Sequence, residues 1–436
     1  MNLRTLGLVL LLSAVICSSG MAQKNLEKSF KLPPDTIQTT VYWYWMSDNI
    51  SKEGVVKDLQ SMKSVGINRA FIGNIGYETT PYGKVKLFSE EWWDIMHTAL
   101  KTATALNIEI GIFNSPGWSQ SGGPWVKPSQ AMRYLTSSKT TATGPKKLDL
   151  QLEQPKGDFQ DVRVIAYKTP KGYGNSIAKL KPKLTSSAPV QNIGNLIDGS
   201  ESTTTSMPAS ESFSIDLETG SDFTARSLVI YPAHKPISIT AQLQVKQNGA
   251  YVTLKEFIID RTNANLNVGF KPYGPVAVSI PASSGKSFRL VFSKSNGFEL
   301  AEILLSQTPV VERYIEKTLA KMFQTPLPYW NEYQWPDQSV IDDNSLVIDP
   351  ATVVDVTKFM SSTGQLKWEA PTGDWTIMRT GMLPTGVQNG PASPEGIGLE
   401  IDKMSKEHVA SHFDAFMGDL LRRIPAADRK TWKVVV

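Results

Sequence analysis

The chain has 436 residues, of which 41% are hydrophobic and 20% charged, so it is long enough for two or three globular domains. Its 45 basic and 41 acidic residues nearly balance at +4, and no basic run is interleaved with aromatic residues, so we expect no nucleic-acid partner. Eleven tryptophans are many for this length, and exposed indoles favour a flat, partly apolar ligand such as a sugar ring.

Residues 1–22 are typical of an export signal, with a basic start, an apolar run of eleven, and Gly20 and Ala22 at the spacing that signal peptidase accepts. That run is too short to span a bilayer, and no later stretch approaches eighteen apolar residues, so we predict no transmembrane segment. Cys17 is the only cysteine, and the bulky Ile16 before it disfavours a lipoprotein anchor. We therefore expect a periplasmic or extracellular protein without disulfides.

Residues 33–144 alternate strand and helix signals. Strands are predicted at 40–45, 68–73 and 108–114, with one helix capped by Ser51 and a second opening at Ser89. This order is typical of parallel βα units, which form either a barrel or a doubly wound sheet. No glycine-rich phosphate motif follows the first strand, which favours the barrel.

Residues 145–308 lose the helical period and instead show short β-rich segments between turn residues, as an all-β sandwich does. The stretch NLIDGSESTTTSM, followed by SFSIDL, resembles the opening of a galactose-binding-like jelly roll. Both a sugar-binding module and a structural insert without a ligand fit this pattern.

Residues 309–436 return to the βα pattern. A helix is predicted over 311–323, a hairpin around 371–373, a strand over 396–403 and an amphipathic helix over 405–423. The predicted fold class is thus α/β plus all-β, with a β-sandwich inserted between two parts of a barrel.

Four sequence blocks carry a resemblance to a known family: residues 43–67, 88–125, 368–381 and 393–414. In this order they resemble glycoside hydrolase family 106, the α-L-rhamnosidases. The resemblance implies an exported enzyme with a (β/α)8 barrel and an inserted β-sandwich. It also implies calcium-assisted, inverting hydrolysis of terminal α-L-rhamnose, so the expected partner is a rhamnose-containing glycan.

The family's longer chains lead us to expect here about the first half of a barrel, an N-terminal fragment that stops at the strand KVVV. An inverting glycosidase needs two carboxylates about 6.5–9.5 Å apart. The resemblance places both catalytic glutamates beyond Val436, which leaves Glu400 as the candidate within the chain. A non-catalytic carbohydrate-binding protein and an inactive truncated enzyme remain open as alternatives.

The loop NSPGWSQSGGPW, residues 114–125, follows the third predicted strand. Functional residues of such barrels lie on the loops at the carboxyl ends of strands, so Trp118 and Trp125 are candidate sugar platforms and Asn114 a candidate hydrogen-bonding residue. The alternative is that both indoles plug the top of the barrel.

Further candidates come from other strands. Trp45, near the end of the first strand, is either a sugar platform or barrel core, and Asn74 follows the second strand. Glu400 and Asp402 alternate with apolar residues, so they either bind rhamnose hydroxyls, with Asp402 the candidate calcium ligand, or pair with Lys403 and Arg379. The helical histidines His97, His408 and His412 lack a third ligand nearby, which disfavours zinc.

Overall fold

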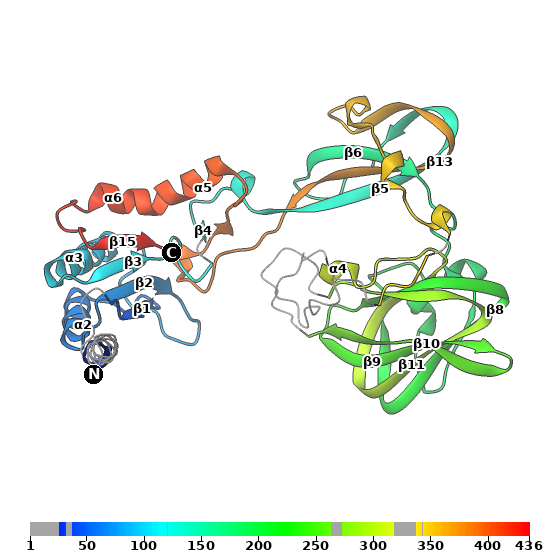
Figure 1. Cartoon of the computed structure of the whole chain (residues 1–436), viewed down its shortest axis with the longest axis horizontal. Coiled ribbons are helices and arrows are strands. Elements are labelled where there is room, and N and C mark those ends of the chain that lie inside the picture. Colours follow the sequence, from blue (N-terminus) through cyan, green and yellow to red (C-terminus); the bar gives the residue numbers. More distant parts are fainter. Residues whose placement is uncertain (1–25, 32–36, 120, 263–272, 318–336, 342) are drawn as a thin grey trace, which may run out of the picture. The chain divides into compact units, whose positions relative to one another are not determined.

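The structure is a computed structural model that describes residues 26–31, 37–119, 121–262, 273–317, 337–341 and 343–436. The chain folds into two compact units (Figure 1). We call Met1–Met132 with Gln388–Val436 the parallel unit, and Arg133–Val387 the β unit. The predicted export signal at 1–22 lies outside the described residues, as does most of the predicted helix over 311–323, of which α4, Tyr314–Lys317, is described.

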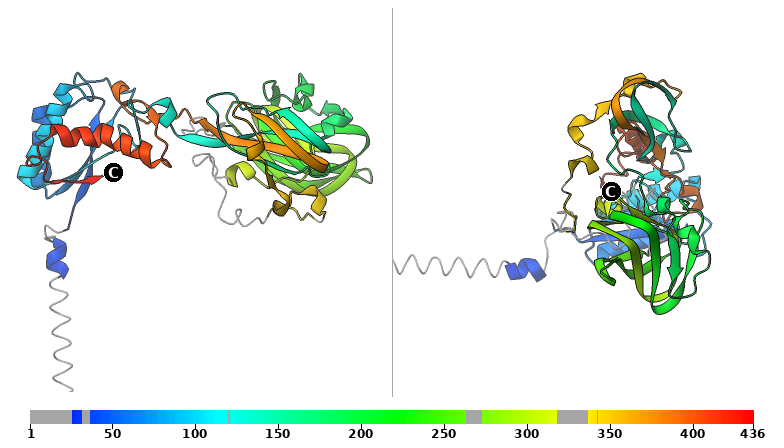
Figure 2. Two further views of the ribbon diagram at one scale, coloured as in Figure 1. Left: turned by 90° about the horizontal axis from the view of Figure 1, so that it is seen from above. Right: turned by 90° about the vertical axis from the view of Figure 1, so that its right-hand side faces the viewer.

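The parallel unit contains a four-stranded sheet in the order β1-β2-β3-β15, and every adjacent pair of strands is parallel. Its helices connect these strands, which confirms the βα pattern predicted from the sequence (Figures 1 and 2). The strands are β1 Thr40–Met46, β2 Arg69–Ile75, β3 Glu109–Ile112 and β15 Trp432–Val435. The helices are α2 Lys52–Ser64, α3 Glu90–Leu106, α5 Lys406–Phe413 and α6 Asp419–Arg423, with a π-helical turn at Asp414–Gly418 between the last two.

Both predicted caps are formed. The Ser51 hydroxyl accepts a hydrogen bond from the Gly54 amide at the start of α2, and Ser89 does the same for Trp92 in α3. Helix α3 then buries seven side chains against the sheet and the later helices. Each large apolar side chain so buried stabilises the unit by roughly 1.5–3 kcal/mol, so together they contribute far more than one cap, which is worth about 0.5–2 kcal/mol.

Side chains of β1 alternate between the two faces of the sheet. Trp43 and Trp45 point to the helices and are buried, whereas Tyr42 on the opposite face is 65% exposed. That opposite face is aromatic: the rings of Tyr42 and Tyr44 stack at 5.5 Å, and Phe113 contacts both. Gly73 lies beneath these rings, where a Cβ atom would approach Tyr44 to 3.1 Å.

The β unit is inserted between β3 and α5, and its two connections to the parallel unit are paired with each other. Strand β4, Gly122–Gly123, pairs with β14, Leu399–Glu400, and the Met132 amide donates to the Glu400 carbonyl at 2.7 Å. The boundaries therefore fall near 133 and 387, whereas the sequence predicted 145 and 308. The parallel unit resumes at 388 instead of 309.

This difference arises from a long-range strand pair. Strand β5, Arg133–Gln151, is antiparallel to β13, Gln365–Pro384, along nearly its whole length, and both belong to the β unit. With β6, Gln160–Lys168, and β12, Val354–Asp355, they form a sheet of order β12-β6-β13-β5. The predicted hairpin around 371–373 is absent from this described region, because β13 continues through it with a shift in register.

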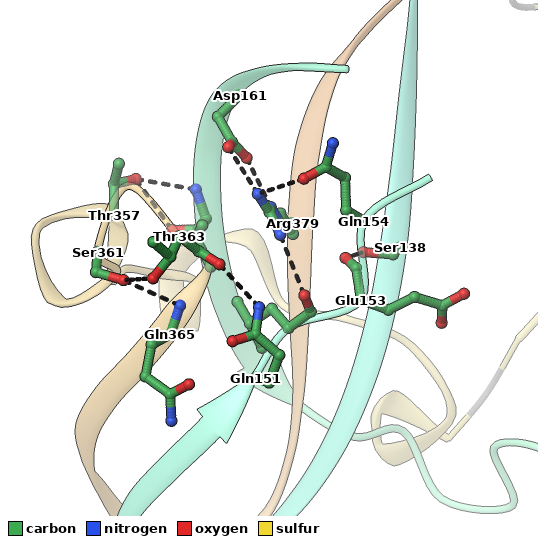
Figure 3. A network of polar contacts seen from close by, with 12 residues as sticks. Ser138, Gln151, Glu153, Gln154, Asp161, Thr357, Ser361, Thr363, Gln365 and Arg379 are labelled. Atoms are coloured by element: carbon green, nitrogen blue, oxygen red, sulfur yellow. Dashed lines mark hydrogen bonds and ion pairs between the residues drawn. The ribbon is translucent and has the colours of Figure 1, made fainter. Parts of the chain in front are cut away.

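Arg379 of β13 holds this sheet together. Arg379 is 2% exposed, and its guanidinium donates two 2.7 Å hydrogen bonds to the Asp161 carboxylate and one of 3.1 Å to the Leu152 carbonyl (Figure 3). The predicted alternative that Arg379 pairs with Glu400 or Asp402 is therefore wrong.

The rest of the β unit is a sandwich whose sheet has the order β10-β9-β11-β8-β7. The long strands β8 and β11 pair with each other in several separate registers as they curve around the core (Figure 2). Alternating residues such as Phe213, Ile215 and Leu217 fill that core. The strand bounds are β7 Lys183–Ser186, β8 Thr205–Pro232, β9 Ile237–Gln247, β10 Ala250–Arg261 and β11 Val276–Ser306. Within the described part of the chain, no helix has the length and apolarity needed to cross a bilayer.

Candidate functional site

The candidate site lies on the parallel unit, where the loops after β1, β2 and β3 meet at the carboxyl ends of the strands. The segment 388–400 crosses these loops. The Gly390 carbonyl accepts from the Trp118 amide at 3.1 Å, and the Pro391 carbonyl accepts from Gly76 at 3.3 Å. The Ser393 hydroxyl donates to the Asp48 carboxylate after β1 at 2.6 Å, so three loops distant in sequence are tied to one segment.

Asn389 fixes that segment, and sequence analysis missed it. Its side chain is 3% exposed, donates to the carbonyls of Pro116 at 2.8 Å and Gly396 at 2.9 Å, and accepts from Gly398 at 2.7 Å. An asparagine beside the Gly390-Pro391 pair is the only sequence signal that points to such a turn.

Trp118 is the most exposed predicted site residue, with 46% of its surface accessible. Its ring contacts Tyr44 at 6.3 Å and Tyr77 at 5.9 Å, so aromatic side chains from three successive βα units meet at one corner. Gly117 has φ of +81° and packs against the backbone of Gly390, where a Cβ atom would come within 2.7 Å. The exposed indole is therefore carried on a fixed backbone.

Tyr77 is fixed in a similar way. Its amide donates to the Ser47 hydroxyl at 3.0 Å, directly after β1. Ser47 and Asp48 both have positive φ, 47° and 61°, although neither is glycine, and such strain is typical of functional loops. The buried Asp48 carboxylate accepts from the Ser393 hydroxyl at 2.6 Å and lies 3.6 Å from the Lys86 ammonium. The only sequence signal for these contacts is that Ser47, Asp48 and Tyr77 directly follow predicted strands, and the sequence analysis did not single them out.

Trp45 and Asn74 lie on the helix side of the sheet. Trp45 is 4% exposed and its ring contacts Trp92 at 6.0 Å. Asn74 is also 4% exposed and accepts from the Trp92 indole at 3.2 Å. This position favours the core alternative for Trp45, and it makes Asn74 a partner of α3.

Trp125 is held between the loop after β3 and the later helices. Its indole N–H donates to Nδ1 of His412 at 2.9 Å, and its ring contacts Phe88 and Phe416. Asn114 starts the same loop, and its backbone lies beside the His412 ring. This packing favours the plug alternative for Trp125, whereas Trp118 presents an accessible face.

The Glu400 carboxylate is 3% exposed and already bonded within the protein. It accepts from the Ser121 hydroxyl and from the Lys403 ammonium, the latter at 3.1 Å. Burial raises the pKa of Glu400, but the hydroxyls of Ser121 and Ser119 and the charge of Lys403 outweigh it and hold that pKa below its ordinary value. Glu400 is therefore ionised and pairs with Lys403, as one predicted alternative stated.

Asp402 does not join Glu400. Its carboxylate accepts from the Met404 amide at 3.0 Å and so caps the turn before α5. Calcium takes six to eight oxygen ligands. Across the described residues, no group of three or more His, Cys, Asp or Glu side chains is placed to hold a metal ion. Calcium stays a prediction.

Four buried polar atoms at these strand ends have no hydrogen-bond partner in the part of the chain that the structure describes. They are Trp45 Nε1, Asp48 Oδ2, Asn74 Nδ2 and Asn114 Oδ1. Each such atom costs about 1–3 kcal/mol, a cost that proteins tolerate mainly at functional sites. The strand ends are thus the place where this unit departs from ordinary core packing.

The sequence profile of glycoside hydrolase family 106, described as alpha-L-rhamnosidase, matches residues 31–436. The chain belongs to this family. A rhamnosidase from Novosphingobium sp. PP1Y is similar in structure, with a TM-score of 0.75 and 26% identity over 92% of this chain and 38% of that chain. A curated relative from Formosa agariphila, named putative beta-glucuronidase, is 24% identical over 92% of this chain and 22% of its own length.

Family 106 membership confirms the resemblance carried by the four sequence blocks and assigns the chain to a family of glycoside hydrolases. The chain spans well under half the length of both relatives. Two of the four blocks, 43–67 and 88–125, supply Tyr44 and Trp118, so two of the three aromatic residues at this corner lie within sequence blocks that carry the family resemblance.

Proposed function

We propose that the protein is an exported α-L-rhamnosidase that removes terminal rhamnose from glycans with inversion, and that this chain contributes sugar-binding loops. The observation that carries the proposal is the corner formed by Tyr44, Tyr77 and Trp118. Pyranose rings have apolar faces that pack on exposed aromatic rings, and such contacts contribute roughly 0.5–1.5 kcal/mol beyond area burial.

The four parallel strands support a (β/α)8 barrel as the framework of this enzyme. In the proposed barrel, the face bearing Tyr42 and Tyr44 lines the interior and the helices lie outside. The loops after β1 to β3 then surround one end of the barrel, where the sugar binds. Both the barrel and the export signal at 1–22 are parts of the proposal.

In this proposal Glu400 is a positioning residue instead of a catalytic acid or base. A general acid must hold a proton near neutral pH, whereas hydrogen bonds and Lys403 keep the pKa of Glu400 low. A general base must reach a water molecule, but the Glu400 carboxylate is buried and bonded to Ser121. The catalytic carboxylate pair is therefore assigned to other residues of the whole protein. Calcium enters no step.

A β-glucuronide is the competing substrate, because of the name of the Formosa relative. Binding its carboxylate requires an available cation. Lys86 and Lys403 at these loops already face Asp48 and Glu400, whereas Lys84 in the loop after β2 has no ion-pair partner among the described residues, so the two substrates must be compared directly. A carbohydrate-binding protein without hydrolysis would use the same aromatic corner, so turnover must be measured alongside binding.

The test compares p-nitrophenyl α-L-rhamnoside with the β-glucuronide, using protein expressed from the whole gene. We expect turnover of the rhamnoside alone, with the β-anomer of rhamnose appearing first by NMR. Trp118→Ala should weaken rhamnose binding about tenfold, whereas Tyr173→Ala, an exposed aromatic residue of the β unit, should not. Rhamnose binding without turnover would support the carbohydrate-binding alternative, and glucuronide turnover would overturn the proposal.

A further inference from the structure

His412 of α5 makes a directional contact with the loop after β3. Its side chain is 2% exposed, and Nδ1 accepts a 2.9 Å hydrogen bond from the indole N–H of Trp125. An imidazole nitrogen can accept only when it carries no proton, so this bond requires the neutral ring with its proton on Nε2.

Aromatic rings surround this pair, and the buried Nε2 of His412 has no hydrogen-bond partner among the described residues. Phe88 and Phe416 contact the Trp125 ring at 5.6 and 5.9 Å, and the His412 ring itself lies 5.6 Å from Trp125. Burial lowers the pKa of His412, and the charge of Lys403 acts in the same direction. The backbone of Asn114 and the charge of Glu400 act against them, but the pKa stays below its ordinary value.

We propose that His412 is a positioning residue that holds the Trp125 side chain at the end of the loop after β3 and releases this side chain when protonated. The inference rests on the proposed function only in that this loop carries the sugar-facing Trp118. Trp125 and Trp118 belong to the same loop, whose other contacts include the Gly390 carbonyl and Asn74. The Trp125 anchor therefore acts together with these contacts on the backbone that presents Trp118.

Protonation reverses the contact at a defined atom. When Nδ1 takes a proton from solvent, its new N–H faces the N–H of Trp125, and two donors repel each other. The indole then becomes a buried donor without an acceptor, which favours release of the Trp125 ring. Glu400 remains ionised at mildly acidic pH because of its low pKa, so it does not cause the change between pH 7 and 5.

The experiment compares His412→Asn with His412→Phe. The amide oxygen of asparagine takes the place of Nδ1 as an acceptor but does not bind protons in this range. Phenylalanine keeps an aromatic ring and offers no acceptor. The control is His408→Asn, one turn earlier on α5, where the side chain is only half buried. Each variant is followed by the NMR signal of the Trp125 indole N–H and by rhamnose affinity between pH 8 and 5.

As the pH falls from 8 to 5, we expect wild type to lose the shifted indole signal and about tenfold in rhamnose affinity. Both changes should have the same midpoint, below pH 6.5. His412→Asn should keep the shifted indole signal and the full rhamnose affinity down to pH 5. His412→Phe should show no shifted indole signal and the weaker affinity at every pH. His408→Asn should follow wild type. A pH-independent indole signal in wild type, or an acid loss retained in His412→Asn, would overturn the inference. If the indole signal titrates while rhamnose never binds, the positioning role stands and the proposed function fails.

Discussion

The Ser121 hydroxyl donates to the Glu400 carboxylate, although 279 positions separate the two residues in the sequence. Ser121 lies before the β unit and Glu400 lies after it, so this bond joins the two paired connections of the insertion. With Lys403 on the other side, the carboxylate is buried among groups that all favour its charge.

Glu400→Gln should therefore destabilise the parallel unit by about 1–3 kcal/mol, because it weakens bonds to a buried charge and leaves Lys403 without its partner. Urea unfolding at pH 7 measures the change. Glu395→Gln is the matched control, since Glu395 lies in the same segment but is exposed. Equal stability of the two variants would mean that the Glu400 contacts contribute nothing net.

The same carboxylate predicts a dependence on pH. The folded-state pKa of Glu400 lies below its ordinary value of 4.5, so its contribution is complete well above pH 4.5 and is lost as pH falls through the folded pKa. The difference in unfolding free energy between wild type and Glu400→Gln should be constant from pH 8 to 6 and shrink below 4.5. A difference that grew in acid would contradict the stated direction of the shift.

Glu302 of β11 should behave in the opposite way. Burial, aided by the charge of Asp198, raises the pKa of Glu302 to about 7, although the backbone N–H groups of Gly199 and Ser200 partly counter it. Its contribution is thus fully present below pH 4.5 and is lost as pH rises through 7. We expect Glu302→Gln to be more stable than wild type at pH 8, by about 2–3 kcal/mol, in buffer with a chelator.

Thermal melting of both proteins from pH 4 to 8 measures this effect. The control is Glu218→Gln on β8, because Glu218 is exposed. A wild-type melting temperature that rises between pH 5 and 8 relative to Glu302→Gln would contradict the prediction.

Arg379→Met should be the most damaging of these changes. The substitution leaves Asp161 without its two hydrogen bonds and removes the donor to the Leu152 carbonyl, at a cost of about 3 kcal/mol. Arg163→Met is the control, since Arg163 approaches Asp355 only at 3.5 Å on an exposed surface. Urea unfolding measures the two costs. Similar losses of unfolding free energy in the two variants would show that burial of Arg379 adds nothing to stability.

Local signals predicted the parallel unit well. A helix cap and an apolar spacing depend only on residues within one helix. The sequence therefore predicts the caps at Ser51 and Ser89 and the buried face of α3 directly. The β5–β13 pair is different. Its strands are separated by more than 200 positions, and nothing local records which distant strand supplies the hydrogen bonds. This is why the predicted boundaries at 145 and 308 differ from those of the compact units.

In the candidate site, too, local sequence predicted some residues, whereas others depend on contacts between distant segments. The composition of the loop 114–125 pointed to Trp118, and its exposure agrees with that prediction. Burial separates Trp118 from Trp45, however, and depends on which face of β1 meets the helices. Tyr77 and Asn389 could be assigned to the site only from their contacts with other loops in the structure.

The pairing of the two connections has a consequence for how this chain can be engineered. Residue 388 bridges to Leu399, and the Met132 amide reaches the Glu400 carbonyl, so the chain leaves and re-enters the parallel unit at neighbouring points. A short turn could therefore replace residues 133–387 without stretching the backbone on either side. The β unit is in this sense an exchangeable cassette, and other modules whose termini lie close together could be transplanted into the same position.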